Sequence, residues 1–156
     1  MNSQDKAREE QLVVFELGQE SYGVEIGRVQ EIDRMERVTA VPHAPAFVEG
    51  VINLRGRITP VVDLRARLGL PRAEPTPRTR IVVAKQGEEW VGLVVDAVSE
   101  VLRIPTDAIE PPSSMVVTSE SACLRGIAKL QDRLIILLDL DRVLDKAVRD
   151  GLAVPA

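Results

Sequence analysis

The 156-residue sequence contains one cysteine, one histidine and an aromatic share of only 3%. The single thiol, Cys123, cannot form an internal disulfide, so we expect a protein of a reducing compartment. One histidine and one cysteine make a four-ligand zinc site untenable, and we expect no metal. Because aromatic residues are scarce, the core must be filled by Val, Ile and Leu, and the β-branched residues among them favour β-sheet.

Basic charge and long apolar runs are also missing. Lys and Arg number 20 against 24 Asp and Glu, a net charge of −4, so no basic excess exists to neutralise a nucleic-acid backbone. No apolar run approaches the roughly 18 residues that a membrane span needs, and the N-terminus lacks the apolar stretch of a signal peptide. We therefore expect a cytoplasmic protein that binds no nucleic acid and does not insert into the membrane.

Motifs of catalysis and cofactor binding are absent as well. Neither Gly-x-Gly-x-x-Gly nor Gly-x-x-x-x-Gly-Lys-Ser/Thr occurs, so we expect no nucleotide cofactor. His43 is interpreted as an exposed loop residue and Cys123 as a small core residue. Asp63 and Asp139 stand at predicted helix starts and are explained as N-caps. We expect no catalytic residue, while a small hydrolase that uses His43 and a carboxylate stays open as a remote alternative.

The sequence does contain a series of short apolar segments separated by Gly and Pro. Residues 12–17 and 22–26 flank Gly18 and predict a β-hairpin, and residues 29–32, 47–54 and 58–62 read as further strands. Trp90 and Tyr22 begin comparable strands and are interpreted as packing residues. Residues 1–10 are polar without periodicity, which predicts a disordered leader.

The second half of the chain repeats the first. Residues 69 positions apart match, for example Gly18 with Gly87 and Gly23 with Gly92, and residues 76 apart match from Gly50 with Gly126 to Leu68 with Leu144. The change of spacing falls in residues 112–124. We therefore predict a mainly β fold of two similar five-stranded barrels with short helices, the last running from Leu140 to about Asp150. The barrels are expected at about 11–70 and 78–150 of a domain at 11–150, on either side of the proline-rich residues 71–77, with an exchange of strands left open.

The turn Asn53-Leu54-Arg55-Gly56-Arg57 carries two guanidinium groups between apolar strands. It is either a solvated hairpin tip or an anchor for the carboxylates of a partner, because the planar guanidinium is preorganised for such contacts. The surface around Val29 and Glu31 is a second candidate for docking.

Five segments of the chain resemble the family of chemotaxis coupling proteins with a CheW-like domain. They are Tyr22–Ile26, Val29–Ile32, Pro45–Gly56, Pro60–Arg65 and Val91–Val98, and the resemblance extends from Leu12 to about Val148. The combination of Asn-Leu-Arg-Gly with the following Pro-Val-Val-Asp-Leu-Arg is highly specific.

The resemblance implies that the two barrels are SH3-like and that the protein is a scaffold without catalytic activity or cofactor. It implies a bridge between the cytoplasmic tips of methyl-accepting chemoreceptors and the regulatory domain of the histidine kinase CheA, within arrays beneath the membrane. The positions that match the receptor-facing groove are Val29, Glu31, Ile32, Asn53, Leu54, Arg55, Gly56, Val98 and Val101. Glu31 and Arg55 are expected to pair across this groove, and Gly50 with its neighbouring strand is the expected kinase contact. A coupling protein of a chemosensory pathway that does not drive swimming fits the same residues and stays open.

Overall fold

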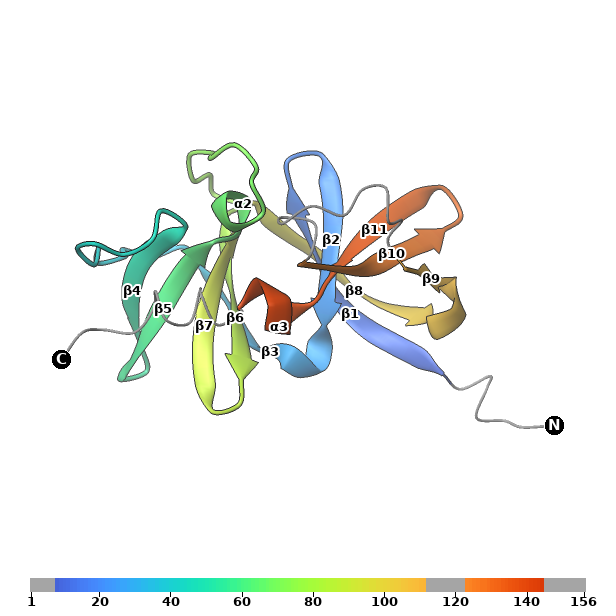
Figure 1. Cartoon of the computed structure of the whole chain (residues 1–156), viewed down its shortest axis with the longest axis horizontal. Helices are drawn as coiled ribbons and strands as arrows, with labels where there is room; N and C mark the ends of the chain where they lie inside the picture. Colours follow the sequence, from blue (N-terminus) through green and yellow to red (C-terminus); the bar gives the residue numbers. More distant parts are fainter. Residues whose placement is uncertain (1–7, 112–122, 145–156) are drawn as a thin grey trace.

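The computed structural model describes residues 8–111 and 123–144, which form eleven β-strands in two sheets (Figure 1). One sheet has six strands in the order β8-β1-β2-β11-β10-β9, and the other has five in the order β3-β6-β7-β5-β4. The strands are β1 (Glu9–Leu17), β2 (Glu20–Glu25), β3 (Val29–Arg34), β4 (Val48–Leu54), β5 (Arg57–Asp63), β6 (Arg80–Gln86), β7 (Glu89–Val95), β8 (Ala97–Pro105), β9 (Ile109–Glu110), β10 (Leu124–Leu130) and β11 (Arg133–Leu138). The helical elements are single turns: η1 (Ile26–Arg28), α2 (Leu64–Arg67), η2 (Thr106–Ala108) and α3 (Leu140–Val143). The prediction of a mainly β fold is confirmed.

The two sheets do not follow the two sequence halves. Strands β1 and β2 lie in the sheet of β8–β11, whereas β6 and β7 lie in the sheet of β3–β5. The division at 11–70 and 78–150 therefore does not describe the sheets, and the arrangement with exchanged strands does. The chain moves from one sheet to the other twice, through the single turn η1 and at Asp96.

The internal repeat survives in the strand register. β5 pairs in parallel with β7, with Val61 opposite Gly92, and β11 pairs in parallel with β2, with Leu137 opposite Gly23. Strand β11 is the equivalent of β5 at the spacing of 76 residues, and β7 is the equivalent of β2 at the spacing of 69. The two parallel pairs are therefore equivalent. Since each equivalent strand has crossed to the other half, the exchange is reciprocal, and apart from β9 the two sheets have the same order of equivalent strands.

The strands β1 and β6 are buried on both faces. In β1, Val13, Phe15 and Leu17 belong to a cluster shared by the two sheets, and the alternate residues Leu12 and Val14 belong to a cluster inside the six-stranded sheet. The equivalent strand β6 divides in the same way between the shared cluster and the interior of the five-stranded sheet. Burial on both faces explains the uninterrupted apolar runs that the sequence shows at these positions.

The described ends of the chain differ from the expectation in one respect. β1 begins at Glu9 instead of Gln11, because Glu9 and Glu10 pair with Pro105 and Ile104 at the end of β8. Most of the predicted leader lies outside the described residues. The predicted C-terminal helix begins at Leu140 as expected, and its continuation beyond residue 144 also lies outside them.

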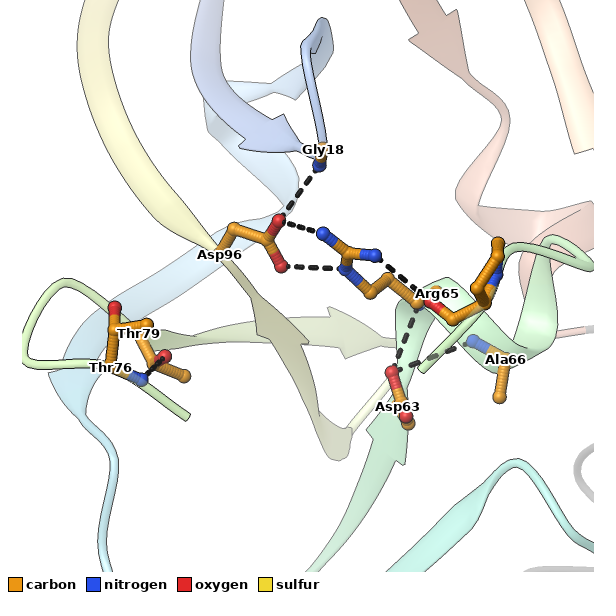
Figure 2. A network of polar contacts seen from close by, with 8 residues as sticks. Gly18, Asp63, Arg65, Ala66, Thr76, Thr79 and Asp96 are labelled. Atoms are coloured by element: carbon orange, nitrogen blue, oxygen red, sulfur yellow. Dashed lines mark hydrogen bonds and ion pairs between the residues drawn. The ribbon is translucent and has the colours of Figure 1, made fainter. Parts of the chain in front are cut away.

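A cluster of polar contacts joins the two sheets where the chain crosses at Asp96 (Figure 2). The Asp96 carboxylate accepts hydrogen bonds from the backbone N–H of Gly18, at the turn between β1 and β2, and from the side chain of Arg65 on α2. Asp63 caps α2 by accepting from the N–H groups of Arg65 and Ala66, which fixes the base of the Arg65 side chain.

Candidate functional site

The turn between β4 and β5 has the geometry that its sequence predicts. Arg55 and Gly56 have φ angles of +54° and +83°, the conformation of the tight two-residue turns that match the twist of antiparallel strands. The N–H of Gly56 donates to the Asn53 side-chain oxygen at 2.9 Å. Asn and Gly thus hold the turn, so that the Arg55 side chain between them is 74% exposed.

The Arg55 side chain reaches Glu31 on β3, as the resemblance implied. Arg55 Nε lies 3.4 Å from Glu31 Oε1, and the Glu31 side chain is only 16% exposed. The hydrogen bond between Glu31 and Asp33, followed by burial and the Asp33 charge, raises the pKa of Glu31, whereas the Arg55 charge acts in the opposite direction. Because Arg55 is solvated, the pair contributes little to stability. Its effect is to hold the guanidinium beside β3.

The second arginine of the turn has a different partner. The Arg57 guanidinium lies 4.2 Å from the centre of the Trp90 ring on β7, and its Nη2 donates to the Glu88 carbonyl oxygen at 2.8 Å. Trp90 also packs against the interior of the five-stranded sheet, which agrees with its interpretation as a packing residue. The contact between Arg57 and Trp90 could not be predicted from the sequence, since 33 positions separate the two residues.

Four of the predicted aliphatic residues face the cluster shared by the two sheets. Directly paired residues of antiparallel strands project to the same face; Val29 is opposite Ala84 and Val98 is opposite Phe15, both members of that cluster. A bulge after Val29 shifts the alternation of β3, so that Ile32 comes to lie opposite Val82, another member.

An equivalent bulge in the pairing of β8 with β1 brings Val101 opposite Val13. Val29 and Val98 are partly buried against the cluster, while Ile32 and Val101 are 39% and 51% exposed. Because β3 and β8 are terminal strands of their sheets, these four side chains lie near the free edges of the sheets.

Two of the predicted site residues are buried. Leu54 is 6% exposed and packs in the interior of the five-stranded sheet, so it supports the turn from inside. Gly50 is buried, with a φ of +146°, and a side chain there would collide with the carbonyl group of Thr39. The repeat-related Gly126 is approached in the same way by the Glu110 carbonyl. The backbone approach of Thr39, which bridges to Val51, accounts for glycine at position 50.

Two exposed residues escaped the sequence interpretation. Ile58 on β5 is 67% exposed and Leu134 on β11 is 57% exposed, and they occupy equivalent positions of the repeat, each the second residue of the strand that follows a hairpin turn. The spacing of 76 residues relates them and is the signal that could have found them. Each sheet therefore presents one solvated aliphatic side chain near a hairpin tip.

The residues considered for chemistry do not converge. Asp63 and Asp139 are both N-caps, as predicted, each accepting from backbone N–H groups of the following turn. Cys123 is buried and His43 is exposed in a loop with a φ of +64°. Within residues 8–111 and 123–144, no group of three His, Cys, Asp or Glu side chains is placed to hold a metal ion. No helix in that same part of the chain is long and apolar enough to cross a membrane.

Comparison with known proteins gives a consistent result. Residues 11–148 match the CheW-like domain. The chain is similar to the chemotaxis protein CheW of Rhizobium meliloti (strain 1021), with 41% identity over 90% of this chain and 91% of that protein. It is also similar to the chemotaxis protein CheW of Klebsiella aerogenes, with 37% identity over 86% of this chain and 81% of that protein. Among solved structures, the scaffolding protein TtCheW from Thermoanaerobacter tengcongensis superimposes with a TM-score of 0.82 at 38% identity, covering 89% of this chain and 94% of that one.

Proposed function

Since the chain belongs to the family of proteins with a CheW-like domain, we propose that it is a non-catalytic scaffold that couples chemoreceptor tips to the regulatory domain of the histidine kinase CheA. The observation that carries this proposal is the match over residues 11–148, at 41% identity to a chemotaxis protein. The likeness to a structure described as a scaffolding protein supports it further. In such a scaffold, the useful output is the simultaneous binding of two partners within an array beneath the membrane.

The receptor-facing surface of the proposal combines a charged turn with an apolar edge. The turn supplies Asn53, Arg55 and Gly56, with Leu54 holding it from inside and Glu31 beside the guanidinium. The aliphatic part consists of Val29, Ile32, Val98 and Val101, all on the face of the shared cluster. Apolar side chains beside a fixed guanidinium suit an amphipathic helix that presents a carboxylate, the mode of helix-in-groove recognition.

The kinase contact is proposed for the outer surface of the β4–β5 hairpin. Gly50 has no side chain to offer a partner and is itself buried, and its part is to let Thr39 approach β4. The exposed aliphatic side chain on the neighbouring strand is Ile58. A solvated Ile near a rigid hairpin can anchor a partner because its burial on binding removes apolar surface from water.

Charge reversal at Arg55 tests the receptor surface. Arg55→Glu is expected to weaken capture of a receptor tip fragment at least about tenfold, because it brings a carboxylate next to Glu31 and to the partner's own carboxylate. Lys129→Glu is the matched control, since Lys129 is also an exposed cation paired with a glutamate, Glu110 at 3.2 Å, but lies on β10 of the other sheet. Equal capture by the wild type and Arg55→Glu would remove Arg55 from the surface.

Co-sedimentation with the kinase regulatory domain and a receptor tip, each alone and then together, tests the scaffold itself. We expect the chain to sediment with either partner and to increase sedimentation of the two together. If it binds neither partner, the proposed function is wrong. The receptors that co-purify with the protein identify the pathway, whether it controls swimming or another response. The hydrolase alternative would require a turnover that His43→Ala abolishes.

A further inference from the structure

One serine side chain lies at the point where the pairing of β8 with β1 shifts its register. Val98 is opposite Phe15, and Glu100 is opposite the adjacent Val14, so Ser99 is the extra residue of a β-bulge. Extra residues of bulges are left out of the strand pairing. Ser99 nevertheless has a partner on β1, because its hydroxyl group donates a hydrogen bond to the Val14 carbonyl oxygen at 3.1 Å.

Both ends of β8 have their register fixed by other contacts. At its start, the Asp96 N–H donates to the Glu16 carbonyl oxygen at 3.0 Å, next to the pair of Glu16 and Ala97. Further along, Leu102 and Ile104 pack in the interior of the six-stranded sheet. Since a shift by one residue would turn these side chains to the opposite face, one extra residue must remain between the two anchors. The anchors do not determine which residue of β8 is the extra one.

Moving the bulge by one residue would change the receptor-facing surface. If Val98 became the extra residue, Ser99 would stand opposite Phe15, and a polar side chain would replace the aliphatic one on the face of the shared cluster. If Glu100 became the extra residue, it would lose the pairing that now brings its carboxylate to Arg133 Nη1 at 2.8 Å. The observed position of the bulge is therefore the one that keeps both neighbours of Ser99 in place.

The serine hydroxyl can favour this position because its hydrogen bond depends on it. A paired residue of a strand directs its side chain out of the plane of the sheet, away from the carbonyl groups of the neighbouring strand. Only as the unpaired residue can Ser99 direct its hydroxyl at the Val14 carbonyl group. A protein hydrogen bond of average net strength changes an equilibrium constant by about fivefold, so the bond shifts the balance between bulge positions by about that factor.

We propose that Ser99 is a positioning residue for Val98: by bonding to the Val14 carbonyl group, it keeps the bulge at position 99 and holds Val98 opposite Phe15. The proposal rests on the receptor-binding function proposed above. Val98 is one of the four aliphatic side chains of that surface and is partly buried against the shared cluster. An exposed serine thus sets the direction of an aliphatic contact for the receptor helix.

The first experiment follows the free protein and needs no partner. In the wild type, the Val98 methyl groups should show NMR cross-peaks to the Phe15 ring. These cross-peaks should weaken in Ser99→Ala, and amide hydrogen exchange of residues 98–100 should become faster by about fivefold. Ser99→Thr should restore both, because threonine carries the same hydroxyl group. Cross-peaks and exchange rates in Ser99→Ala equal to those of the wild type would overturn the proposal.

Thr106→Val is the matched control. The Thr106 hydroxyl donates to the Arg8 carbonyl oxygen at 3.2 Å, so it makes the same kind of contact between the end of β8 and the residue that precedes β1. Valine has the shape of threonine without the hydroxyl group. This variant should leave the cross-peaks between Val98 and Phe15 unchanged. A change as large as that in Ser99→Ala would show that any lost hydroxyl disturbs the strand pair, and would refute the specific role of Ser99.

The second experiment measures binding of a receptor tip fragment. Ser99→Ala should bind about threefold more weakly than the wild type, whereas Ser99→Thr and Thr106→Val should bind as well as the wild type. Val98→Ala should weaken binding at least as much as Ser99→Ala. Adding Ser99→Ala to Val98→Ala should cause no further loss, because the serine acts through the Val98 side chain.

Equal binding by Ser99→Ala and the wild type, or losses that add in the double variant, would overturn the proposal. If the wild type does not bind the receptor fragment, the proposed function fails, while the cross-peaks between Val98 and Phe15 still decide the role of Ser99.

Discussion

Both carboxylate oxygens of Asp96 are held by the guanidinium of Arg65, with Nε 2.9 Å from Oδ1 and Nη2 2.5 Å from Oδ2. Asp96 lies where the chain crosses between the sheets, and Arg65 lies on the turn that follows β5. At the other crossover, Arg28 of η1 contacts Asp141 of α3 at 2.9 Å. Position 141 is the repeat equivalent of position 65, at a spacing of 76 residues. The charges are exchanged between the two ion pairs: the residue on the helical turn after the strand is the cation Arg65 in one pair and the anion Asp141 in the other.

Removing the Asp96 carboxylate should destabilise the protein. Asp96→Asn leaves the partly buried Arg65 without its bidentate partner, and we expect a loss of about 1–3 kcal/mol in the free energy of unfolding at pH 7. Arg65→Lys should not restore the geometry, because an ammonium group cannot make two parallel bonds. Urea unfolding measures both, and stabilities equal to that of the wild type would show that the pair is dispensable.

The same contact predicts a pH dependence. The hydrogen bond from Arg65, followed in effect by that from Gly18, lowers the pKa of Asp96 below its ordinary value, although burial opposes the shift. A carboxyl whose pKa is lower in the folded state stabilises the fold above its unfolded pKa of about 4, and that contribution is lost as the pH falls through the folded value. The difference between wild type and Asp96→Asn should therefore be full at neutral pH and shrink below about pH 4.

The ion pair between Arg28 and Asp141 at the other crossover should contribute less to the free energy of unfolding than the pair between Arg65 and Asp96. The Asp141 side chain is 66% exposed, whereas that of Asp96 is 30% exposed. Solvated ion pairs contribute little, so Asp141→Asn should cost less than about 1 kcal/mol. Urea unfolding of Asp141→Asn and Asp96→Asn under the same conditions measures both losses of stability. Equal losses would contradict this ranking.

Trp90 is the single tryptophan of the chain, and its fluorescence should separate the two arginines of the β4–β5 turn. Arg57→Leu removes the cation from the Trp90 ring, so the emission should shift and stability should fall by about 1 kcal/mol. Arg55→Leu should leave the emission unchanged because Arg55 contacts Glu31. The same emission change in both variants would indicate that the turn itself has been disturbed.

Two glycines of the β4–β5 hairpin should respond differently to alanine. At Gly50 a side chain meets the Thr39 backbone in addition to a positive φ, and we expect a loss of at least about 2 kcal/mol. At Gly56 the φ is also positive, but the space around it is open, and the loss should be about 1 kcal/mol. Thermal unfolding of the two alanine variants shows which one loses more stability. A greater loss at Gly56 would mean that Thr39 can move away from β4.

The strands and caps were readable from the sequence because their signals are local. The runs at β1 and β6, the repeated glycines and the capping residues Asp63 and Asp139 each act within a few positions. The assignment of strands to sheets was not readable, since β5 and β11 carry equivalent sequences and β2 could pair with either. The bulge beside Val29, which turns Ile32 toward the shared cluster, depends on β6 and leaves no local mark.

The order of the strands has a practical consequence for anyone who wishes to divide this protein. Strands β3 to β7 are consecutive in the chain and make up one whole sheet, whereas the other sheet is assembled from both ends of the chain. In terms of gene architecture, residues 29–95, which form the five-stranded sheet, are an insert in the sequence of the six-stranded sheet. That host sequence is interrupted after Glu25 and resumes at Ala97. The insert can be encoded as one continuous piece with the Arg55 turn intact, but the host can be encoded alone only by splicing its two pieces together.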